Sequence, residues 1–140
     1  MNKVVLVTGG FDPLHSGHIA YFRAAKELGD YLVVGINSDA WLERKKDRAF
    51  MNWNERATIV KNLKMVDYVI EFDDTDDSAR DAIQTVKQTW AGHEIVVANG
   101  GDRTAQNIPE TGINGVTYEW GVGGTYKMNS SSDLLTNWTA

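Results

Sequence analysis

The chain contains no cysteine, which excludes disulfide bonds and metal sites built from thiolates. It has 2 prolines in 140 residues, and no apolar run approaches the roughly 20 residues that a membrane-spanning helix needs. Acidic residues outnumber basic ones by 19 to 14, and the formal net charge of −5 argues against a general nucleic-acid-binding surface. The N-terminus enters a strand-like run after one lysine, without a signal peptide. We therefore expect a cytoplasmic protein that binds neither nucleic acid nor membrane.

The length and the 42% hydrophobic content predict one domain over residues 1–140. Apolar runs bounded by polar or glycine residues predict strands at 4–7, 30–37, 66–70, 94–98 and 115–120. Helical patterns fall between most of these runs, and a further helix is expected over 134–138. Such an alternation predicts an α/β fold, a three-layer α/β/α Rossmann-like sandwich with a mostly parallel sheet. Ligands of such sheets bind at the carboxyl ends of the strands.

A glycine turn and two histidines follow the first predicted strand. Gly9 and Gly10 allow the backbone to approach a ligand and to adopt φ values that other residues avoid. Ser16 is the expected N-cap of the first helix. His15 and His18 are three residues apart, so near the start of a helix they point the same way. Helix N-termini attract anions, so this junction predicts a phosphate site.

Residues 11–18 read Phe-Asp-Pro-Leu-His-Ser-Gly-His and match the F-D-x-x-H-x-G-H signature. By this motif the chain resembles the cytidylyltransferase-like nucleotidylyltransferases. The resemblance continues, in the expected order, through residues 35–39, 45–46, 54–56, 66–69 and 99–102. It covers almost the whole chain and is nearest to the adenylyltransferase domain that makes ADP-heptose and to the glycerol-3-phosphate cytidylyltransferases. The middle of the chain is closer to the ADP-heptose type.

The resemblance implies transfer of a nucleoside monophosphate from CTP or ATP to a small phosphorylated sugar or polyol, with release of pyrophosphate. The attacking phosphate is already ionised, so catalysis needs alignment and charge neutralisation rather than a general base. Mg²⁺ is expected to accompany the nucleoside triphosphate, bound mainly by phosphate oxygens and water. Members of the family commonly pair, so a homodimer is expected.

The resemblance also assigns residues. It gives catalytic roles to His15, His18, Lys45, Lys46 and Arg56. It gives nucleotide contacts to Thr8, Gly9, Gly10, Phe11, Asp12, Gly17, Asp102, Ser130, Ser131 and Ser132. Possible substrate contacts are Asp39, Arg48 and Lys127. Several assignments have a plainer alternative: capping or surface histidines for His15 and His18, a solvated charge run for the lysines, a surface ion pair for Arg56, a turn for Asp102 and N-capping for the serines.

The C-terminal part departs from the cytidylyltransferases, which carry R-T-x-G-I-S-T-T where residues 125–132 read Thr-Tyr-Lys-Met-Asn-Ser-Ser-Ser. The arginine and the glycine are missing, and Lys127 is the candidate replacement for the lost positive charge. Asn99 stands where the relatives have a lysine before the two glycines. These differences leave open the choice between CTP and ATP and the identity of the acceptor. They also support an alternative, a non-catalytic nucleotide-binding module of the same fold.

Two further interpretations are disfavoured. The acidic stretch at residues 73–77 lacks the spacing of a calcium loop, so we expect a solvated loop and no dedicated metal site in the protein. A dinucleotide-binding oxidoreductase would carry G-x-G-x-x-G after the first strand, and this chain does not.

Overall fold

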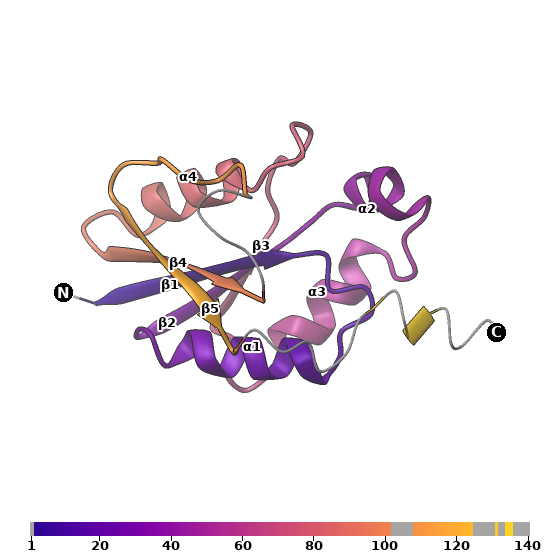
Figure 1. The fold of residues 1–140 in the computed structure, drawn as a ribbon, viewed down its shortest axis with the longest axis horizontal. Helices are drawn as coiled ribbons and strands as arrows, with labels where there is room; N and C mark the ends of the chain where they lie inside the picture. The colour runs from indigo at the N-terminus through magenta and orange to yellow at the C-terminus, as the bar shows by residue number, and fades with distance from the viewer. Residues whose placement is uncertain (1, 102–107, 125–130, 132–133, 136–140) are drawn as a thin grey trace.

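The computed structural model describes residues 2–101, 108–124, 131 and 134–135. Its centre is a parallel sheet with strand order β3-β2-β1-β4-β5 (Figure 1). The strands are β1 Lys3–Gly9, β2 Tyr31–Ile36, β3 Tyr68–Ile70, β4 Glu94–Gly100 and β5 Val116–Val122. The helices are α1 Ser16–Lys26, α2 Asp39–Lys46, α3 Trp53–Lys61 and α4 Arg80–Thr89. Within these described segments, no helix has the length and apolar character that crossing a bilayer requires.

The central strands are apolar on both faces because helices cover the sheet from both sides. Val5 and Val7 of β1 point to the face that α1 and α3 cover. Val4 and Leu6 point to the opposite face, where they pack against Ile83 and its neighbours on α4. Figure 1 shows α4 on one side of the sheet, with α1 and α3 on the other. The predicted three-layer sandwich with a parallel sheet is therefore confirmed.

The strand order places a ligand crevice at one edge of the sheet. β1 lies between β2 and β4. The chain first adds β2 and β3 on one flank of β1 and then adds β4 and β5 on the opposite flank, so the strand order reverses at β1. Parallel α/β sheets bind ligands outside the carboxyl ends of the strands at such a reversal. Gly9 pairs with Ile36 in the register of β1 with β2, so these two strands end side by side. The α2 helix lies beyond this edge (Figure 1).

The predicted strand boundaries shift by a few residues. The expected third strand at 66–70 is regular only from Tyr68 to Ile70. The fourth and fifth strands extend past their predicted ends, to Gly100 and Val122. The predicted helix over 134–138 falls mostly outside the described residues.

Candidate active site

The loop after β1 is fixed by Phe11, whose side chain is buried and whose φ is 53°. The Phe11 ring meets the rings of His18 and Phe22 edge to face, with centroids 5.1 Å apart in both pairs. Phe22 belongs to the core under α1. Phe11 therefore connects the histidine motif to the hydrophobic core and restricts the plane of the His18 ring.

The two motif histidines cap α1. The Nδ1 atom of His15 accepts from the backbone N–H of Gly17, and the Nδ1 atom of His18 accepts from the backbone N–H of His15, both at 3.1 Å. The rings stack with centroids 3.8 Å apart, which confirms that they point the same way. Because each Nδ1 is an acceptor, the proton of each neutral ring is on Nε2. The N–H donors of the pair are therefore the two Nε2 atoms, and the rings lie at a helix N-terminus, where anions are favoured.

The prediction that Ser16 caps α1 is wrong. The helix begins at Ser16 and its N-cap is His15, in extended backbone conformation. An imidazole Nδ1 accepts a backbone N–H as the short side chains of Ser, Asn or Asp do at other helices. The caps of the next two helices are short polar side chains, Ser38 for α2 and Asn52 for α3.

Neither Gly9 nor Gly10 has a positive φ, so the conformational reason expected for these glycines does not hold. The requirement is steric. A Cβ on Gly9 would lie 2.9 Å from the Phe11 ring, and a Cβ on Gly10 would lie 3.0 Å from the Leu42 side chain. These glycines therefore let Phe11 and α2 pack tightly onto the end of β1.

Arg56 has no exposed surface and donates four hydrogen bonds to the protein. Its acceptors are the carbonyls of Met51, Gly10 and Asn37, at 3.0, 2.9 and 2.7 Å, and the Asp39 carboxylate at 2.6 Å. These acceptors occupy four of the five guanidinium N–H groups. Arg56 is thus a joint between the ends of β1 and β2 and the start of α2, and its predicted phosphate contact stays a prediction.

Asp12 is also buried and engaged with the protein. Its carboxylate accepts from the backbone N–H groups of Phe50 and Met51, at 2.6 and 2.8 Å. The residue therefore attaches the segment between α2 and α3 to the histidine motif. Its assignment to the nucleotide is not tested by this geometry.

Lys45, Lys46 and Arg48 are exposed at the C-terminal end of α2 and just after it. The Lys45 Nζ atom lies 5.6 Å from the centroid of the Trp41 ring. That ring is close to the motif loop, because a Cβ on Gly10 would meet Trp41 at 3.4 Å. Trp41 therefore lies between Lys45 and the carboxyl end of β1.

One predicted residue of the C-terminal segment is placed at the motif. The Ser131 hydroxyl donates to the carbonyl of Pro13 at 2.7 Å, across 118 residues of sequence. The remaining predicted residues of this part, Asp102, Lys127, Ser130 and Ser132, lie outside the described residues. Ser131 thus contacts the loop that carries the histidines.

The expectation of a solvated acidic loop at residues 73–77 is wrong for Asp74. Its side chain is 3% exposed and accepts hydrogen bonds from Asn37 and Ser38. Arg44 donates to the Asp74 carbonyl and to the carboxylate of Asp77. A buried carboxylate needs hydrogen-bond donors. Here the donors are Asn37 and Ser38, which are far from Asp74 in the sequence.

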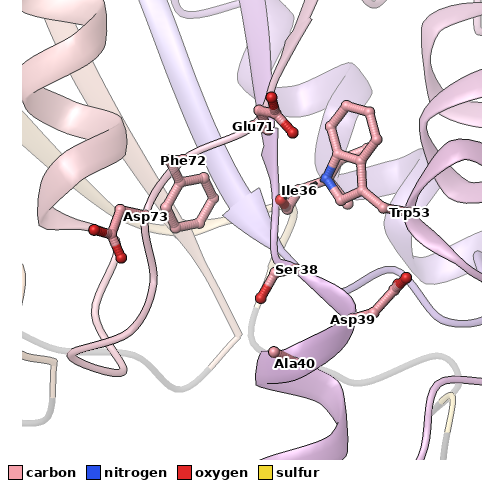
Figure 2. Close-up of a pocket in the computed structure, with 8 residues that line it drawn as sticks. All are labelled: Ile36, Ser38, Asp39, Ala40, Trp53, Glu71, Phe72 and Asp73. Carbon is pink, nitrogen blue, oxygen red and sulfur yellow. Dashed lines mark hydrogen bonds between the residues drawn. The ribbon is translucent and has the colours of Figure 1, made fainter.

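A cavity of about 590 Å³ opens at the carboxyl ends of β2 and β3 (Figure 2). It is lined by Ile36, Ser38, Asp39, Ala40, Trp53, Glu71, Phe72 and Asp73. Figure 2 shows Phe72 and Asp73 on one side of the opening and Trp53 on the other. The Trp53 ring is fixed by its indole N–H, which donates to the Ile36 carbonyl at 3.0 Å.

The cavity is acidic. The Asp39 carboxylate is paired with Arg56, whereas Glu71 and Asp73 are exposed acids. Hydrogen bonds from the Thr75 hydroxyl and backbone N–H lower the pKa of Asp73 from its ordinary 3.8, so this carboxylate is ionised at neutral pH. Sequence reasoning identified only Asp39 of this lining. Residues 71–73 directly follow the strand predicted at 66–70, at the edge of the sheet where ligands bind. That position was the sequence signal that could have identified these three as lining residues.

Across the described parts of the chain, no group of three or more His, Asp or Glu residues is placed to hold a metal ion.

Comparison with known proteins places this site in context. A family profile described as Cytidylyltransferase-like matches residues 6–122. The chain is 38% identical over 108 residues to the bifunctional protein HldE of Nitratiruptor, a match that covers 76% of this chain and 22% of the relative. It is 49% identical over 74 residues to HldE of Campylobacter concisus, covering 51% and 16%. The chain therefore matches about a fifth of the length of these relatives.

Solved structures have the same fold. A lipopolysaccharide core biosynthesis protein of Thermoplasma volcanium is similar with a TM-score of 0.66 and 28% identity, over 86% of this chain and 96% of that one. A bifunctional NMN adenylyltransferase/ADP ribose pyrophosphatase of Francisella tularensis has a TM-score of 0.68 and 14% identity, over 99% and 42%. The second likeness concerns the fold alone.

Proposed function

Because this chain belongs to the cytidylyltransferase-like family of nucleotidylyltransferases, we propose that it transfers a nucleoside monophosphate from ATP or CTP to a small phosphorylated sugar or polyol. Pyrophosphate is the second product. ATP with a sugar phosphate is the pair to test first, since the chain is similar to HldE proteins and to a lipopolysaccharide core biosynthesis protein.

The observation that carries the proposal is the stacked histidine pair at the N-terminus of α1. Both rings use Nδ1 as a capping acceptor, which puts the N–H donor of each neutral ring on Nε2. The helix dipole adds positive potential at the same place. This arrangement suits the phosphates of a nucleoside triphosphate at the edge of the sheet where β1 and β4 diverge.

In the proposed reaction an ionised oxygen of the acceptor phosphate attacks the α-phosphorus. The bond between the α-phosphorus and the bridging oxygen to the β-phosphate breaks, and that oxygen leaves with pyrophosphate. No proton has to be removed from the nucleophile, so the protein contributes alignment and donors for the developing charge. His15 and His18 donate to the phosphates, and Lys45 and Lys46 approach them from the end of α2.

Arg56 and Asp12 support these groups. Arg56 fixes the Gly10 carbonyl and the start of α2, and Asp12 fixes the segment after α2. Ser131 reaches the motif from the C-terminal segment, which supports its predicted contact with the nucleotide. The Mg²⁺ ion enters as part of the nucleotide substrate, bound by phosphate oxygens and water.

The cavity suits the part of the acceptor that is not phosphate. Carboxylates such as Glu71 and Asp73 accept hydrogen bonds from hydroxyl groups, and the rings of Trp53 and Phe72 offer apolar surface to a carbon chain or sugar ring. The Asp39–Arg56–Gly10 contacts connect the cavity wall to the motif loop. The acidic lining favours an acceptor whose remaining groups are neutral hydroxyls.

The deciding experiment measures pyrophosphate release with each of the four common nucleoside triphosphates across a panel of phosphorylated sugars and polyols. Release with ATP or CTP in the presence of one acceptor class is the expected result. Nucleotide binding without release in every combination would instead support the non-catalytic module. Three further expectations stay predictions: one domain over residues 1–140, a homodimer, and a cytoplasmic location.

A further inference from the structure

The buried carboxylate of Asp74 joins the loop after β3 to the start of α2. Its Oδ2 atom accepts from the Asn37 side-chain amide at 3.0 Å and from the Ser38 backbone N–H at 2.8 Å. Its Oδ1 atom accepts from the Ser38 hydroxyl at 2.7 Å. The Asp74 carbonyl accepts from Arg44 one turn and a half along the helix, at 2.8 Å. Every one of these donors lies between residues 37 and 44.

The α2 helix has few other attachments to the scaffold. Leu42 is its only fully buried residue, and it packs over Gly10. Asp39 is half-exposed and pairs with Arg56. A helix of 8 residues with so little apolar surface is held mainly by polar contacts. The Asp74 contacts and the Arg56–Asp39 pair together fix its N-terminus.

Asp74 also borders the cavity. Glu71, Phe72 and Asp73 line one wall, and Asp74 follows them directly. Ser38, which donates two hydrogen bonds to the Asp74 carboxylate, also lines the cavity. A single carboxylate thus connects the cavity wall with the helix that carries Lys45 and Lys46.

We propose that Asp74 is a positioning residue that fixes α2, and with it Lys45 and Lys46, relative to the acceptor cavity. This inference rests on the proposed function, because it requires the lysines to meet phosphate while the acceptor occupies the cavity. In a reaction catalysed by alignment, displacement of the lysines by about an ångström lowers the rate strongly. Asp74 contacts no substrate in this scheme and acts only through α2.

The first test replaces Asp74 by asparagine, which keeps the size of the side chain. Both carboxylate oxygens now accept hydrogen bonds, and asparagine puts an NH2 donor in place of one of them. We expect kcat for pyrophosphate release to fall roughly 10- to 100-fold. The matched control is Asp77→Asn. Asp77 also pairs with Arg44, but its side chain is 56% exposed, and exposed pairs contribute little, so we expect a change of less than about threefold.

A double-mutant cycle separates positioning from a general loss of structure. Asp74→Asn is measured in the wild-type chain and in a Lys45→Gln/Lys46→Gln background. If Asp74 acts through the lysines, the additional loss in that background is small, because the groups that it positions are already missing. Losses that multiply would overturn the proposal. If Asp74→Asn does not fold, Ser38→Ala removes one of the contacts and is expected to show the same non-additivity with a smaller loss.

Hydrogen exchange of the α2 amides gives a readout that does not depend on turnover. We expect faster exchange over residues 39–46 in Asp74→Asn than in Asp77→Asn. Unchanged exchange overturns the inference about Asp74, whatever the activity. If the wild-type chain releases no pyrophosphate while exchange in Asp74→Asn is faster, the proposed function fails, and with it the catalytic part of this inference.

Discussion

The imidazole ring of His15 stacks on that of His18 at 3.8 Å, with the ring planes inclined by 24°. Each ring also accepts a backbone N–H through Nδ1, so the two side chains stabilise the N-terminus of α1 where the loop after β1 ends. In the proposed reaction, the structural role and the catalytic role therefore belong to different nitrogen atoms of the same ring. This makes the two roles separable by substitution.

For His18, asparagine preserves an oxygen near the position of Nδ1 and removes Nε2–H. We expect His18→Asn to lower kcat about 10²-fold or more, as loss of a transition-state donor does, while the KM for the nucleotide changes less. His18→Ala should lose the same activity and also about 0.5–2 kcal/mol of stability, because the His15 backbone N–H then loses its Nδ1 acceptor as well. Steady-state pyrophosphate release and thermal unfolding measure the two effects. Normal turnover by either variant would disprove the mechanism.

The lysines are tested by removing their charge. Lys45→Gln and Lys46→Gln should each lower kcat/KM by roughly 10-fold or more, because a hydrogen bond between a cation and phosphate contributes about 1.5–3 kcal/mol. Lys61→Gln is the control, since Lys61 is exposed at the end of α3. The losses should be smaller at high salt, where the charge is screened. Equal activity in all three variants would mean that residues 45–46 are only a solvated charge run.

Arg56 is expected to control stability. Replacing it by methionine leaves the carbonyls of Gly10, Asn37 and Met51 without their donor and should lower the free energy of unfolding by about 3 kcal/mol or more. Arg23→Met, at an exposed position on α1, should change it by less than about 0.5 kcal/mol. Urea denaturation measures both. If Arg56 acted only as a surface ion pair, both substitutions would lower the free energy of unfolding by equally small amounts, and that result would contradict the prediction.

The acidic cavity predicts selectivity against acceptors with a second anionic group. Wild-type protein should use a sugar monophosphate better than the corresponding bisphosphate, and Glu71→Gln/Asp73→Asn should reduce that preference roughly fivefold, as expected for removal of about 1 kcal/mol of repulsion near the surface. Asp77→Asn, outside the cavity lining, should leave it unchanged. The ratio of kcat/KM for the two acceptors is the measurement. A ratio unaffected by the double substitution would place the acceptor elsewhere.

The pKa of Asp73 predicts how the preference for the monophosphate acceptor responds to pH. The contacts from Thr75 hold the pKa of Asp73 below 3.8, so its carboxylate stays charged as pH falls from neutrality and is protonated only in strong acid. A folded-state pKa that is depressed also means that the Thr75–Asp73 contacts stabilise the fold above the ordinary pKa and are lost as pH falls through the lower one. The acceptor preference should therefore be constant between about pH 5 and 8 as far as Asp73 sets it. A preference that disappears near pH 6 would point to a different titrating group.

Much of the fold followed from local patterns. Continuous apolar runs such as residues 31–36 identified buried parallel strands, because strands covered on both faces need no polar alternation. The caps Ser38 and Asn52 were within reach of prediction because their side chains act on neighbours a few residues away. His15 was missed because its cap uses a ring nitrogen that the usual rules for N-caps omit.

By itself, the sequence determined the layered α/β architecture and the position of the histidine motif at the end of β1, since both depend on hydrophobic periodicity and residue order along the chain. It did not reveal that Arg56 is fully buried or that Asp74 fixes α2. Those roles depend on partners 17 to 46 residues away in sequence. Only the tertiary structure decides them, because the environment of a charged side chain is created by the segments that fold around it.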